Sequence, residues 1–361
     1  MKVLLVTNMY PSESLPYSGI FVKAQYEYFK THFAEKDRVN IFFMRQVISS
    51  GIMTYLKYLM AYVNFLPHLF KKYDVVHVHF LGMLAPVANL YKFFRPSTKL
   101  VLTLHGGDIN DDMPEEGKKN NFFRRIIKKF DLVVPVGPAL HEPLKRKLGR
   151  TPDNTLCAGV DHNLFYRLQR EKIYDFVVVG SFLPVKGLDT LVKALQEDDM
   201  PRVRLCFVGN GPLEPLLHQL SNKHDVTILN NKSHSELREI YNQSKFLLFT
   251  SRGDAFGLVV TEAIYCGTPA IVCKTGGGAH QIEEGVNGYI YSENTVEVIK
   301  EQLITVINMP QSEYKKLALT TVDTNHQFAL QTVCEVYYGY YRNTNYSTAF
   351  NNLQTANHGT H

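Results

Sequence analysis

The sequence predicts an α/β fold of two Rossmann-like domains that face each other across a cleft. Three observations predict it. Short apolar runs, typical of buried parallel strands, alternate with helical stretches along the chain. A polar stretch, YRLQREKIY at residues 166–174, interrupts this alternation near the middle. The length of 361 residues is enough for two domains with separate cores.

In the first half, strands are expected where apolar residues form short runs, and helices in the longer stretches between them. The expected helices span residues 20–33, 54–71 and 83–94. The expected strands, in order, are KVLLVT, residues 38–43, DVVHVH, KLVLTLH and DLVVPV.

The second half repeats this alternation. Its expected helices span residues 188–195, 212–220, 235–243 and 258–266, and a Tyr-rich helix is expected at 326–341. Its expected strands are DFVVVG, RLCFVG, VTIL, KFLLFT and AIVC.

The polar interruption sets the predicted domain organisation. We expect an N-terminal domain at residues 1–168 and a C-terminal domain at 169–325. A C-terminal helix at 326–345 is expected to cross back to the first domain, and a polar, Asn-rich tail at 346–361 to be poorly ordered.

The bulk composition, 45% hydrophobic and 20% charged residues, is that of an ordinary globular protein. Five cysteines without paired spacing indicate free thiols in a reducing compartment. No signal segment is evident, and the longest apolar stretch, residues 52–70, is interrupted by polar residues. A cytoplasmic location is therefore expected.

The charge is uneven along the chain. Residues 1–165 carry 22 Lys and Arg against 14 Asp and Glu, a net charge of +8, whereas the remainder carries 17 against 20, a net charge of −3. Such asymmetry indicates that the first half faces something anionic. No nucleic-acid-binding module is recognisable, so nucleic acid is not the expected partner.

One carboxylate stands out. Glu262 is the only charged residue after Asp254 in DAFGLVVTEAIYCGTPAIV, within a short helix that is apolar nearly all round. A buried carboxylate needs a partner, and no Lys or Arg lies within a helical turn of it. Either Glu262 reaches solvent or caps a loop, or its partner is a ligand, such as a pair of sugar hydroxyls.

Three more charged or glycine-rich segments follow strands of the second half. Lys186, in GSFLPVKG, lies beside glycines at a helix start, where amides and a cation suit a diphosphate; a solvated Lys is the alternative. Asp254 precedes a helix start and is equally compatible with a helix cap. The three glycines at 276–278 either let amides approach a phosphate or form a flexible loop.

The first half offers a further pair at a strand end. KLVLTLH ends in His105, and Asp108 follows three residues later. Ligands of parallel sheets bind at the carboxyl ends of strands, so this His and Asp are expected at the mouth of the cleft. His77 and His79 alternate on another strand without a third ligand, and no metal site is expected.

Together, in this order, these segments resemble retaining glycosyltransferases with the GT-B fold, of the glycosyltransferase family 4 type (glycosyl transferases group 1). The resemblance extends from MKVLLVTNMYPS to GVNGYIY. Its most specific segment is residues 254–285, where two acidic residues separated by seven precede GGG. Three further segments fit the family: SGIFVKAQ, VGSFLPVKGLDTLVKAL and HSELREIYNQSKFLLFTSR.

The resemblance implies that the second domain binds a nucleotide-sugar, a UDP- or GDP-sugar, and that no other cofactor is required. Glu262 would accept hydrogen bonds from the ribose hydroxyls, and Asp254 would contact the donor sugar. His105 would position that sugar, and Asp108 would help place donor or acceptor. The residues implied near the diphosphate or at the helix start beside it are Gly19, Ser181, Lys186, Arg252, Phe256, Gly257 and Leu258.

Two positions depart from the family pattern. Asp254 stands where Glu is usual, and its side chain reaches about one methylene less far toward the sugar. Ser181 stands where Arg is usual, which removes a cation from the diphosphate. Lys186, Arg252 or Lys274 would have to compensate.

The chemistry implied is departure of a nucleoside diphosphate from an anomeric carbon, assisted by cations and amides aimed at the phosphates. The family retains anomeric configuration, and attack from the leaving group's own face needs no protein nucleophile. Metal dependence is not expected, because no Asp-x-Asp motif follows a strand. Domain closure would exclude water.

The acceptor is expected to be a glycan or a lipid-linked glycan. Residues 118–130 interleave aromatics and cations and could lie as a basic amphipathic helix on an anionic membrane, peripherally at the inner face of the cell membrane. An ordinary packed helix is the alternative. Six apolar or aromatic residues could form an apolar face nearby: Tyr55, Leu56, Tyr58, Leu59, Tyr62 and Phe65.

The sequence is also compatible with other function classes. Ser181 and Asp254 are compatible with a catalytically silent relative that binds a nucleotide-sugar or a partner. A GT-B epimerase or phosphorylase is the nearest enzymatic alternative. A Rossmann dehydrogenase is disfavoured, because the first strand leads into NMYP without a glycine fingerprint.

Overall fold

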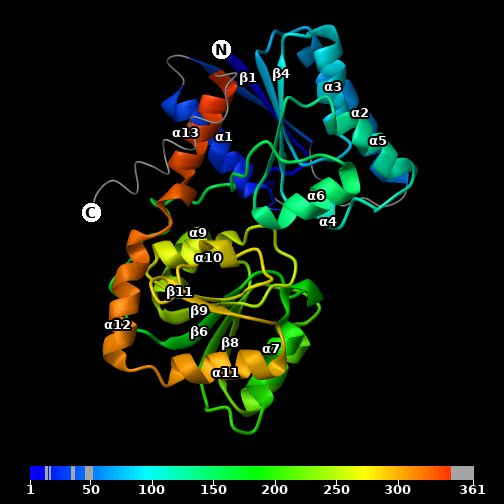
Figure 1. The fold of residues 1–361 in the computed structure, drawn as a ribbon. Coiled ribbons are helices and arrows are strands. Elements are labelled where there is room, and N and C mark those ends of the chain that lie inside the picture. Colours follow the sequence, from blue (N-terminus) through cyan, green and yellow to red (C-terminus); the bar gives the residue numbers. More distant parts are fainter. Residues whose placement is uncertain (13–14, 16–17, 34–36, 45–51, 343–361) are drawn as a thin grey trace. The chain divides into compact units, whose positions relative to one another are not determined.

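The computed structural model describes residues 1–12, 15, 18–33, 37–44 and 52–342 (Figure 1). The chain divides into two compact units. The first comprises Met1–Gly159 together with the chain from Leu330 onward, and the second comprises Val160–Ala329. The tail predicted at 346–361 lies outside the described residues.

The first unit is built on a five-stranded parallel sheet in the order β2-β1-β3-β4-β5. All five strands expected from apolar runs are present. Both faces of the sheet are covered, so all five residues of β3 are buried, and β1 and β4 are buried beyond their first residues, Lys2 and Lys99. The strands are β1 (Lys2–Thr7), β2 (Arg38–Phe43), β3 (Val75–His79), β4 (Lys99–Leu104) and β5 (Leu132–Pro135).

Figure 1 shows α1 and α13 together on one side of this sheet and α2, α3 and α5 on the other. The α13 helix begins at Leu330 rather than at 326, because His326–Phe328 form a 3₁₀ turn and Ala329 is extended. The helices are α1 (Ile20–His32), α2 (Ile52–Leu69), α3 (Ala85–Phe94), α4 (Gly107–Asn110), α5 (Lys118–Ile127), α6 (His141–Leu148) and α13 (Leu330–Arg342), with a 3₁₀ helix at Pro138–Leu140.

The second unit has a six-stranded parallel sheet in the order β11-β10-β9-β6-β7-β8. Alternate residues of β6 belong to different hydrophobic clusters. Phe176 and Val178 pack into one cluster, and Val177 packs into the other. The short strand β11 was not predicted, since GYIY is only half-buried and lacks a long apolar run. The strands are β6 (Tyr174–Val179), β7 (Arg204–Val208), β8 (Asp225–Leu229), β9 (Ser244–Phe249), β10 (Ala270–Cys273) and β11 (Gly288–Tyr291).

Helices α7 and α11 contribute to one hydrophobic cluster of this unit, and α9 and α10 to the other (Figure 1). The α-helices are α7 (Leu188–Gln196), α8 (Glu214–His218), α9 (His234–Asn242), α10 (Leu258–Tyr265), α11 (Val296–Ile307) and α12 (Gln311–Thr320). The 3₁₀ helices are Pro184–Lys186, Gln219–Asn222, Ala279–Gln281, Thr321–Asp323 and His326–Phe328.

The boundary between the units falls earlier than the polar stretch that marked it in the sequence. The Val160 amide donates to the Phe328 carbonyl at 2.9 Å, and the Leu168 amide donates to Asn242 Oδ1 at 2.6 Å. Val160 and Phe165 are buried in the core of the second unit. The segment before residue 169 is therefore tied to the second unit by its own side chains, whatever the polarity of the residues that follow.

Each sheet reverses its strand order once, between β1 and β3 in the first unit and between β6 and β9 in the second. In open parallel sheets, ligands bind in the crevice outside the carboxyl ends of the strands at such a switch point. All five cysteines are buried free thiols, as expected. In the chain as described, no helix has the length and apolar character needed to span a membrane.

Candidate active site

Lys186 and Asp254 meet at the switch point of the second unit. Lys186 ends the 3₁₀ turn that follows β6, and Asp254 lies in the loop that follows β9. The ammonium of Lys186 donates to both carboxylate oxygens of Asp254, each at 2.7 Å. Both side chains are about one quarter exposed. The two residues therefore form one paired site, and Asp254 takes up two of the three N–H donors of Lys186.

The loops that carry this pair are fastened to each other. The Arg252 amide donates to the Val185 carbonyl at 2.8 Å, and Thr250 Oγ1 donates to the Lys186 carbonyl at 2.7 Å. These bonds hold the chain after β6 beside the chain after β9. Thr250 was not singled out from the sequence, because a Thr at the end of an apolar strand carries no distinctive signal.

Among the described residues, the side chains of Arg252 and Ser181 make no hydrogen bond to the Lys186–Asp254 pair. The guanidinium of Arg252 donates to the Pro184 carbonyl at 3.0 Å and to Asp189 Oδ2 at 3.1 Å. Arg252 thus braces the start of α7 instead of standing open to a ligand. Ser181 is exposed in the loop after β6.

The glycine-rich loop after β10 packs on the loop that contains Asp254. A Cβ added to Gly277 would lie 2.0 Å from the Asp254 carbonyl oxygen, so only glycine allows this approach. Gln281, buried and not foreseen, donates to the carbonyls of Phe256 at 2.7 Å and Gly257 at 3.1 Å. The glycines at 276–278 therefore have a packing role.

These contacts fix the backbone conformation where α10 begins. Phe256 is buried, Gly257 takes the left-handed conformation at φ 81°, and Leu258 is the first helical residue. No described side chain caps this helix start. Uncapped amides at a helix N-terminus favour an anion.

Glu262, in the second turn of α10, is half-buried rather than enclosed. The Tyr241 hydroxyl, from α9, donates to Glu262 Oε2 at 2.9 Å. This is the one hydrogen bond that the described residues make to the carboxylate. Although the residue as a whole is only half-buried, burial of its carboxyl group raises the pKa of Glu262 to about 7, and the Tyr241 hydrogen bond lowers that pKa only in part.

In the first unit, Asp108 is buried and holds backbone amides. Its Oδ1 accepts from the Gly106 amide at 2.9 Å and from the His105 amide at 3.1 Å, and its Oδ2 accepts from the Leu81 amide at 2.9 Å. Burial raises the pKa of Asp108 to about 6, against the lowering effect of these amides. Asp108 thus fixes the loop after β4 onto the loop after β3.

His105 is half-buried between aromatic rings. Its ring centroid lies 4.7 Å from that of Phe21 and 4.3 Å from that of Phe80. Its Nε2 lies 3.1 Å from His79 Nδ1. Burial, and then the neighbouring His79, hold the pKa of His105 well below its usual range, so the ring is neutral near pH 7.

Gly19 lies at the other loop of this switch point. It precedes α1 with φ 66°, and a Cβ there would lie 2.3 Å from the Met9 carbonyl oxygen. Any side chain would therefore displace the loop after β1. Close packing against Met9 therefore explains why position 19 is glycine, which the sequence alone did not reveal.

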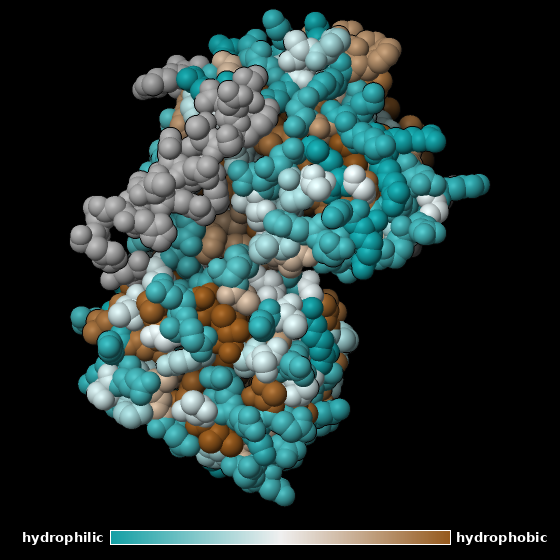
Figure 2. Space-filling view, in the orientation of Figure 1, coloured by the Kyte–Doolittle hydropathy of each residue, from teal (hydrophilic) through white to brown (hydrophobic). Residues whose placement is uncertain are grey.

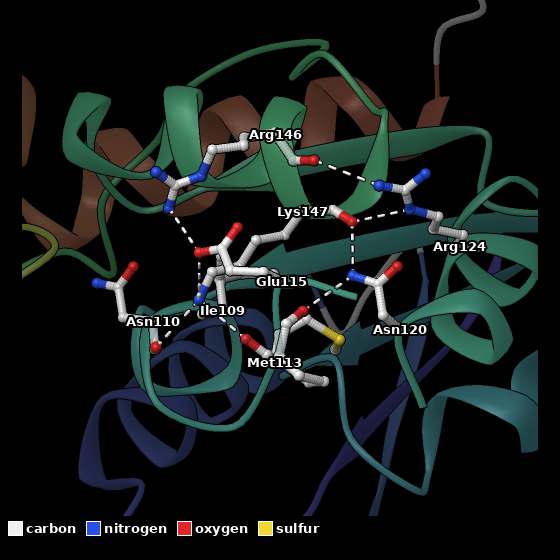
Figure 3. A network of polar contacts seen from close by, with 9 residues as sticks. Ile109, Asn110, Met113, Glu115, Asn120, Arg124, Arg146 and Lys147 are labelled. Atoms are coloured by element: carbon white, nitrogen blue, oxygen red, sulfur yellow. Dashed lines mark hydrogen bonds and ion pairs between the residues drawn. The ribbon is translucent and has the colours of Figure 1, made fainter. Parts of the chain in front are cut away.

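Lys147 is a residue that sequence reasoning missed. It belongs to α6, is buried, and donates from Nζ to the carbonyls of Ile109, Asn110 and Met113 at 2.8, 3.2 and 2.9 Å (Figure 3). Its own carbonyl accepts from Asn120 Nδ2 at 2.7 Å. Lys147 thereby anchors the segment that follows Asp108. Nothing distinguishes it in the sequence from its neighbours in LKRKL.

The described residues bring no three His, Cys, Asp or Glu side chains close enough to hold a metal ion. His77, His79 and His105 lie near one another, but their ring contacts are stacking and a single nitrogen–nitrogen approach.

Two family models match the chain in succession. Glycosyltransferase Family 4 matches residues 30–164, and Glycosyl transferases group 1 matches residues 164–319. The chain belongs to the group 1 glycosyltransferases. The predicted family is therefore confirmed. The two models meet at residue 164, near the start of the second unit, which begins at Val160.

Curated relatives of this group 1 glycosyltransferase are distant. It is 27% identical over 239 residues to an uncharacterized glycosyltransferase of Methanocaldococcus jannaschii, covering 65% of this chain and 66% of the relative. It is also 27% identical over 252 residues to the N-acetyl-alpha-D-glucosaminyl L-malate synthase of Bacillus anthracis, covering 65% of each. The match thus spans slightly less than two thirds of these relatives' own lengths.

Solved structures confirm the fold. Sucrose-phosphate synthase from Thermosynechococcus elongatus matches with a TM-score of 0.72 at 18% identity, covering 95% of this chain and 98% of that one. HepE from Anabaena, in complex with UDP and glucose, matches with a TM-score of 0.70 at 18% identity, covering 94% and 99%. At these identities the likeness shows the fold, two parallel-sheet α/β domains of the GT-B type.

Proposed function

We propose that this chain is a retaining glycosyltransferase that moves a sugar from a UDP- or GDP-sugar to a glycan or lipid-linked glycan. The observation that carries the proposal is Glu262, a half-buried carboxylate to which the described residues supply one hydrogen bond. Its remaining acceptor capacity suits the paired hydroxyls of a ribose. The structural relative HepE was solved with UDP and glucose, which supports a nucleotide-sugar donor.

The diphosphate is proposed to bind at the switch point of the second unit. Lys186 keeps a third N–H donor while it holds Asp254, and that donor can reach a phosphate oxygen. The amides at the start of α10, Phe256, Gly257 and Leu258, add positive potential. Charge that develops on the leaving diphosphate is then stabilised by this chain's own groups, without a metal ion.

Asp254 is proposed to contact the donor sugar while it remains paired with Lys186. Its two oxygens are fixed by Lys186, so the shorter side chain is compensated by a defined orientation. Ser181 is proposed to add a hydroxyl beside the diphosphate, and Arg252 to hold the loop through Pro184 and Asp189. The cation absent at 181 would thus be replaced in part by Lys186.

Residues of the first unit are proposed to serve the sugar and the acceptor. His105, neutral and half-exposed, is a hydrogen-bond donor or acceptor for a sugar hydroxyl. Asp108 is proposed to act through the backbone that it fixes, and Gly19 to let the loop after β1 approach the donor phosphates. Retention is proposed to follow from acceptor attack on the leaving group's own face.

A catalytically silent nucleotide-sugar-binding protein is the second candidate. The exposed Ser181 and the closed Lys186–Asp254 pair favour it, because both reduce the cationic charge offered to a leaving diphosphate. A GT-B epimerase or phosphorylase would share the donor site and differ in its products.

The test is incubation of the protein with a panel of UDP- and GDP-sugars and candidate glycan acceptors, with nucleotide release and product anomer measured. Transfer with retained configuration is expected, and Glu262→Ala should lower donor use at least about tenfold, since charged hydrogen bonds contribute about 1.5–3 kcal/mol. Exposed Glu313→Gln in α12 is the control. Binding without turnover would identify the silent candidate, and inversion would refute retention.

A membrane surface is proposed as the site of acceptor delivery. Helix α2 buries Ala61 and Phe65, yet a second apolar stripe on it faces outward beside α3. Figure 2 shows apolar residues along the edge of the first unit where Figure 1 places these helices. The exposed apolar residues of this α2–α3 face are Met53, Leu56, Leu59, Met60, Val63, Leu66, Phe70, Leu90, Phe93 and Phe94.

The charge around this face favours an anionic surface. In the apolar face expected from the sequence, Phe65 is buried, and Tyr58 and Tyr62 are half-buried. Among the cations of α5, Arg124 donates a hydrogen bond to the Lys147 carbonyl. We propose that the α2–α3 face inserts among lipid headgroups while the flanking cations bind anionic lipid. The exposed cations are Lys71, Lys72, Arg95, Lys118, Lys119, Arg125, Lys128 and Lys129.

A further inference from the structure

We propose that His79 is a positioning residue that sets the proton arrangement of His105, so that His105 presents Nδ1–H to the sugar. This inference rests on the proposed function for the role of His105, but its central measurement needs no turnover. The two residues lie on neighbouring strands and their loops, His79 at the end of β3 and His105 just beyond β4.

The contact between the two rings requires one proton. His79 Nδ1 and His105 Nε2 are 3.1 Å apart. Two lone pairs or two N–H groups at that distance would repel, so one nitrogen donates and the other accepts. Either His79 Nδ1–H donates to His105, or His105 Nε2–H donates to His79.

Burial of His79 decides between these arrangements. His79 is 1% exposed, and its Nε2 has no hydrogen-bond partner among the described residues. If His79 accepted at Nδ1, its single proton would sit on Nε2 as a buried, unpaired N–H donor, the costlier kind of orphan group. With the proton on Nδ1, His79 donates to His105 Nε2, which must then be unprotonated. The proton of neutral His105 is left on Nδ1.

The rest of the cluster holds His79 in place and supplies no competing charge. His77 stacks on His79 at 4.3 Å between ring centroids, and its Nδ1 lies 2.6 Å from the Tyr341 hydroxyl of α13. Thr103 Oγ1 bridges His77 Nε2 at 2.7 Å and the Tyr337 hydroxyl at 2.8 Å.

The two rings have aromatic neighbours and one nearby carboxylate. His77 stacks on His79, and the rings of Phe21 and Phe80 flank His105. The carboxylate of Asp108 is occupied by backbone amides, that of His105 among them, while Thr103, Tyr337 and Tyr341 contact His77. Burial lowers the pKa of His79 to about 3, which keeps this donor neutral through the physiological range. Helix α13, from the end of the chain, thus holds His77, which stacks on the ring that orients His105.

The experiment is ¹⁵N NMR of histidine-labelled full-length protein, in which two-bond couplings distinguish the two tautomers of each ring. The expected spectrum shows His105 protonated at Nδ1 and unprotonated at Nε2. His79→Leu, which removes the donor, should shift His105 toward the Nε2–H form. His79→Asn retains an amide donor at the place of Nδ1 and should restore the original tautomer. Thr103→Val disturbs the same cluster without touching His105 and should leave it unchanged.

Kinetics give a second readout. His79→Leu should lower kcat by up to about tenfold, the effect of one neutral hydrogen bond, with the donor KM little changed and with recovery in His79→Asn. A wild-type spectrum with His105 protonated at Nε2 would overturn the proposal, as would an unchanged tautomer in His79→Leu. A matching spectrum in a protein that transfers no sugar would refute the proposed function and leave the positioning role standing.

Discussion

Glu262 is a titratable carboxylate in an otherwise largely apolar helix, α10. Val260, Ala263 and Ile264 around it are buried, so the desolvated carboxyl holds its proton up to a pKa of about 7. The sequence identified this carboxylate as unusual. It could not identify Tyr241 as its hydrogen-bond donor, because that contact joins two helices. For the same reason Lys186 and Asp254 were each singled out without their pairing, which depends on which strands adjoin.

The raised pKa of Glu262 predicts a pH dependence of nucleotide binding. Only the carboxylate accepts hydrogen bonds from both ribose hydroxyls, so affinity for a nucleoside diphosphate should fall as the pH drops below about 7. Titration calorimetry across that range measures it. The phosphate itself also titrates near pH 6, so Glu262→Gln serves as the reference. Identical pH profiles for both proteins would contradict the assignment.

At the level of elements, hydrophobic pattern was sufficient for the strands of both sheets except β11. It was insufficient for the short helix α4, whose place depends on contacts from elsewhere. Lys147 of α6 donates to three carbonyls at the end of α4 and just beyond it (Figure 3). A basic residue in the last turn of a helix is usually solvated, so its burial was not predictable from LKRKL.

The Lys147 contacts predict a large effect on stability. Lys147→Met should lower the free energy of unfolding by about 3 kcal/mol, because buried carbonyls lose a charged donor. Lys145→Met, at an exposed position of the same helix, is the matched control. Urea unfolding followed by circular dichroism gives both values. Equal midpoints for the two variants would show that the buried ammonium contributes nothing.

For the whole molecule, alternation and length predicted two α/β units, and the structural matches confirm that fold. The predicted domain boundary, after residue 168, lies later in the chain than the one between the two units, after Gly159. It was judged from polarity, whereas Val160 and Phe165 pack into the core of the second unit. The outward apolar stripe of α2 could not be separated from its buried face in the sequence. An 18-residue helix that is apolar on two faces gives no periodic signal for choosing between them.

The α2–α3 face predicts salt-sensitive membrane binding. Wild-type protein should sediment with phosphatidylglycerol vesicles at low salt and be released as salt screens the cations. Leu59→Glu with Val63→Glu should abolish sedimentation, since it places charge in the inserted face. Leu319→Glu in α12, whose residue is 57% exposed in the second unit, should not. No sedimentation of wild-type protein at low salt would end the membrane proposal.

The most direct test of the central claim pairs Glu262 with the hydroxyls that it is proposed to bind. The dissociation constants of UDP or GDP and of the matching 2′,3′-dideoxy nucleotide are measured against wild-type protein and Glu262→Ala. Removing the hydroxyls should weaken wild-type binding at least about tenfold and leave the variant nearly unchanged, since the shared hydrogen bonds are already lost. An equal loss in both proteins would show that the ribose binds elsewhere.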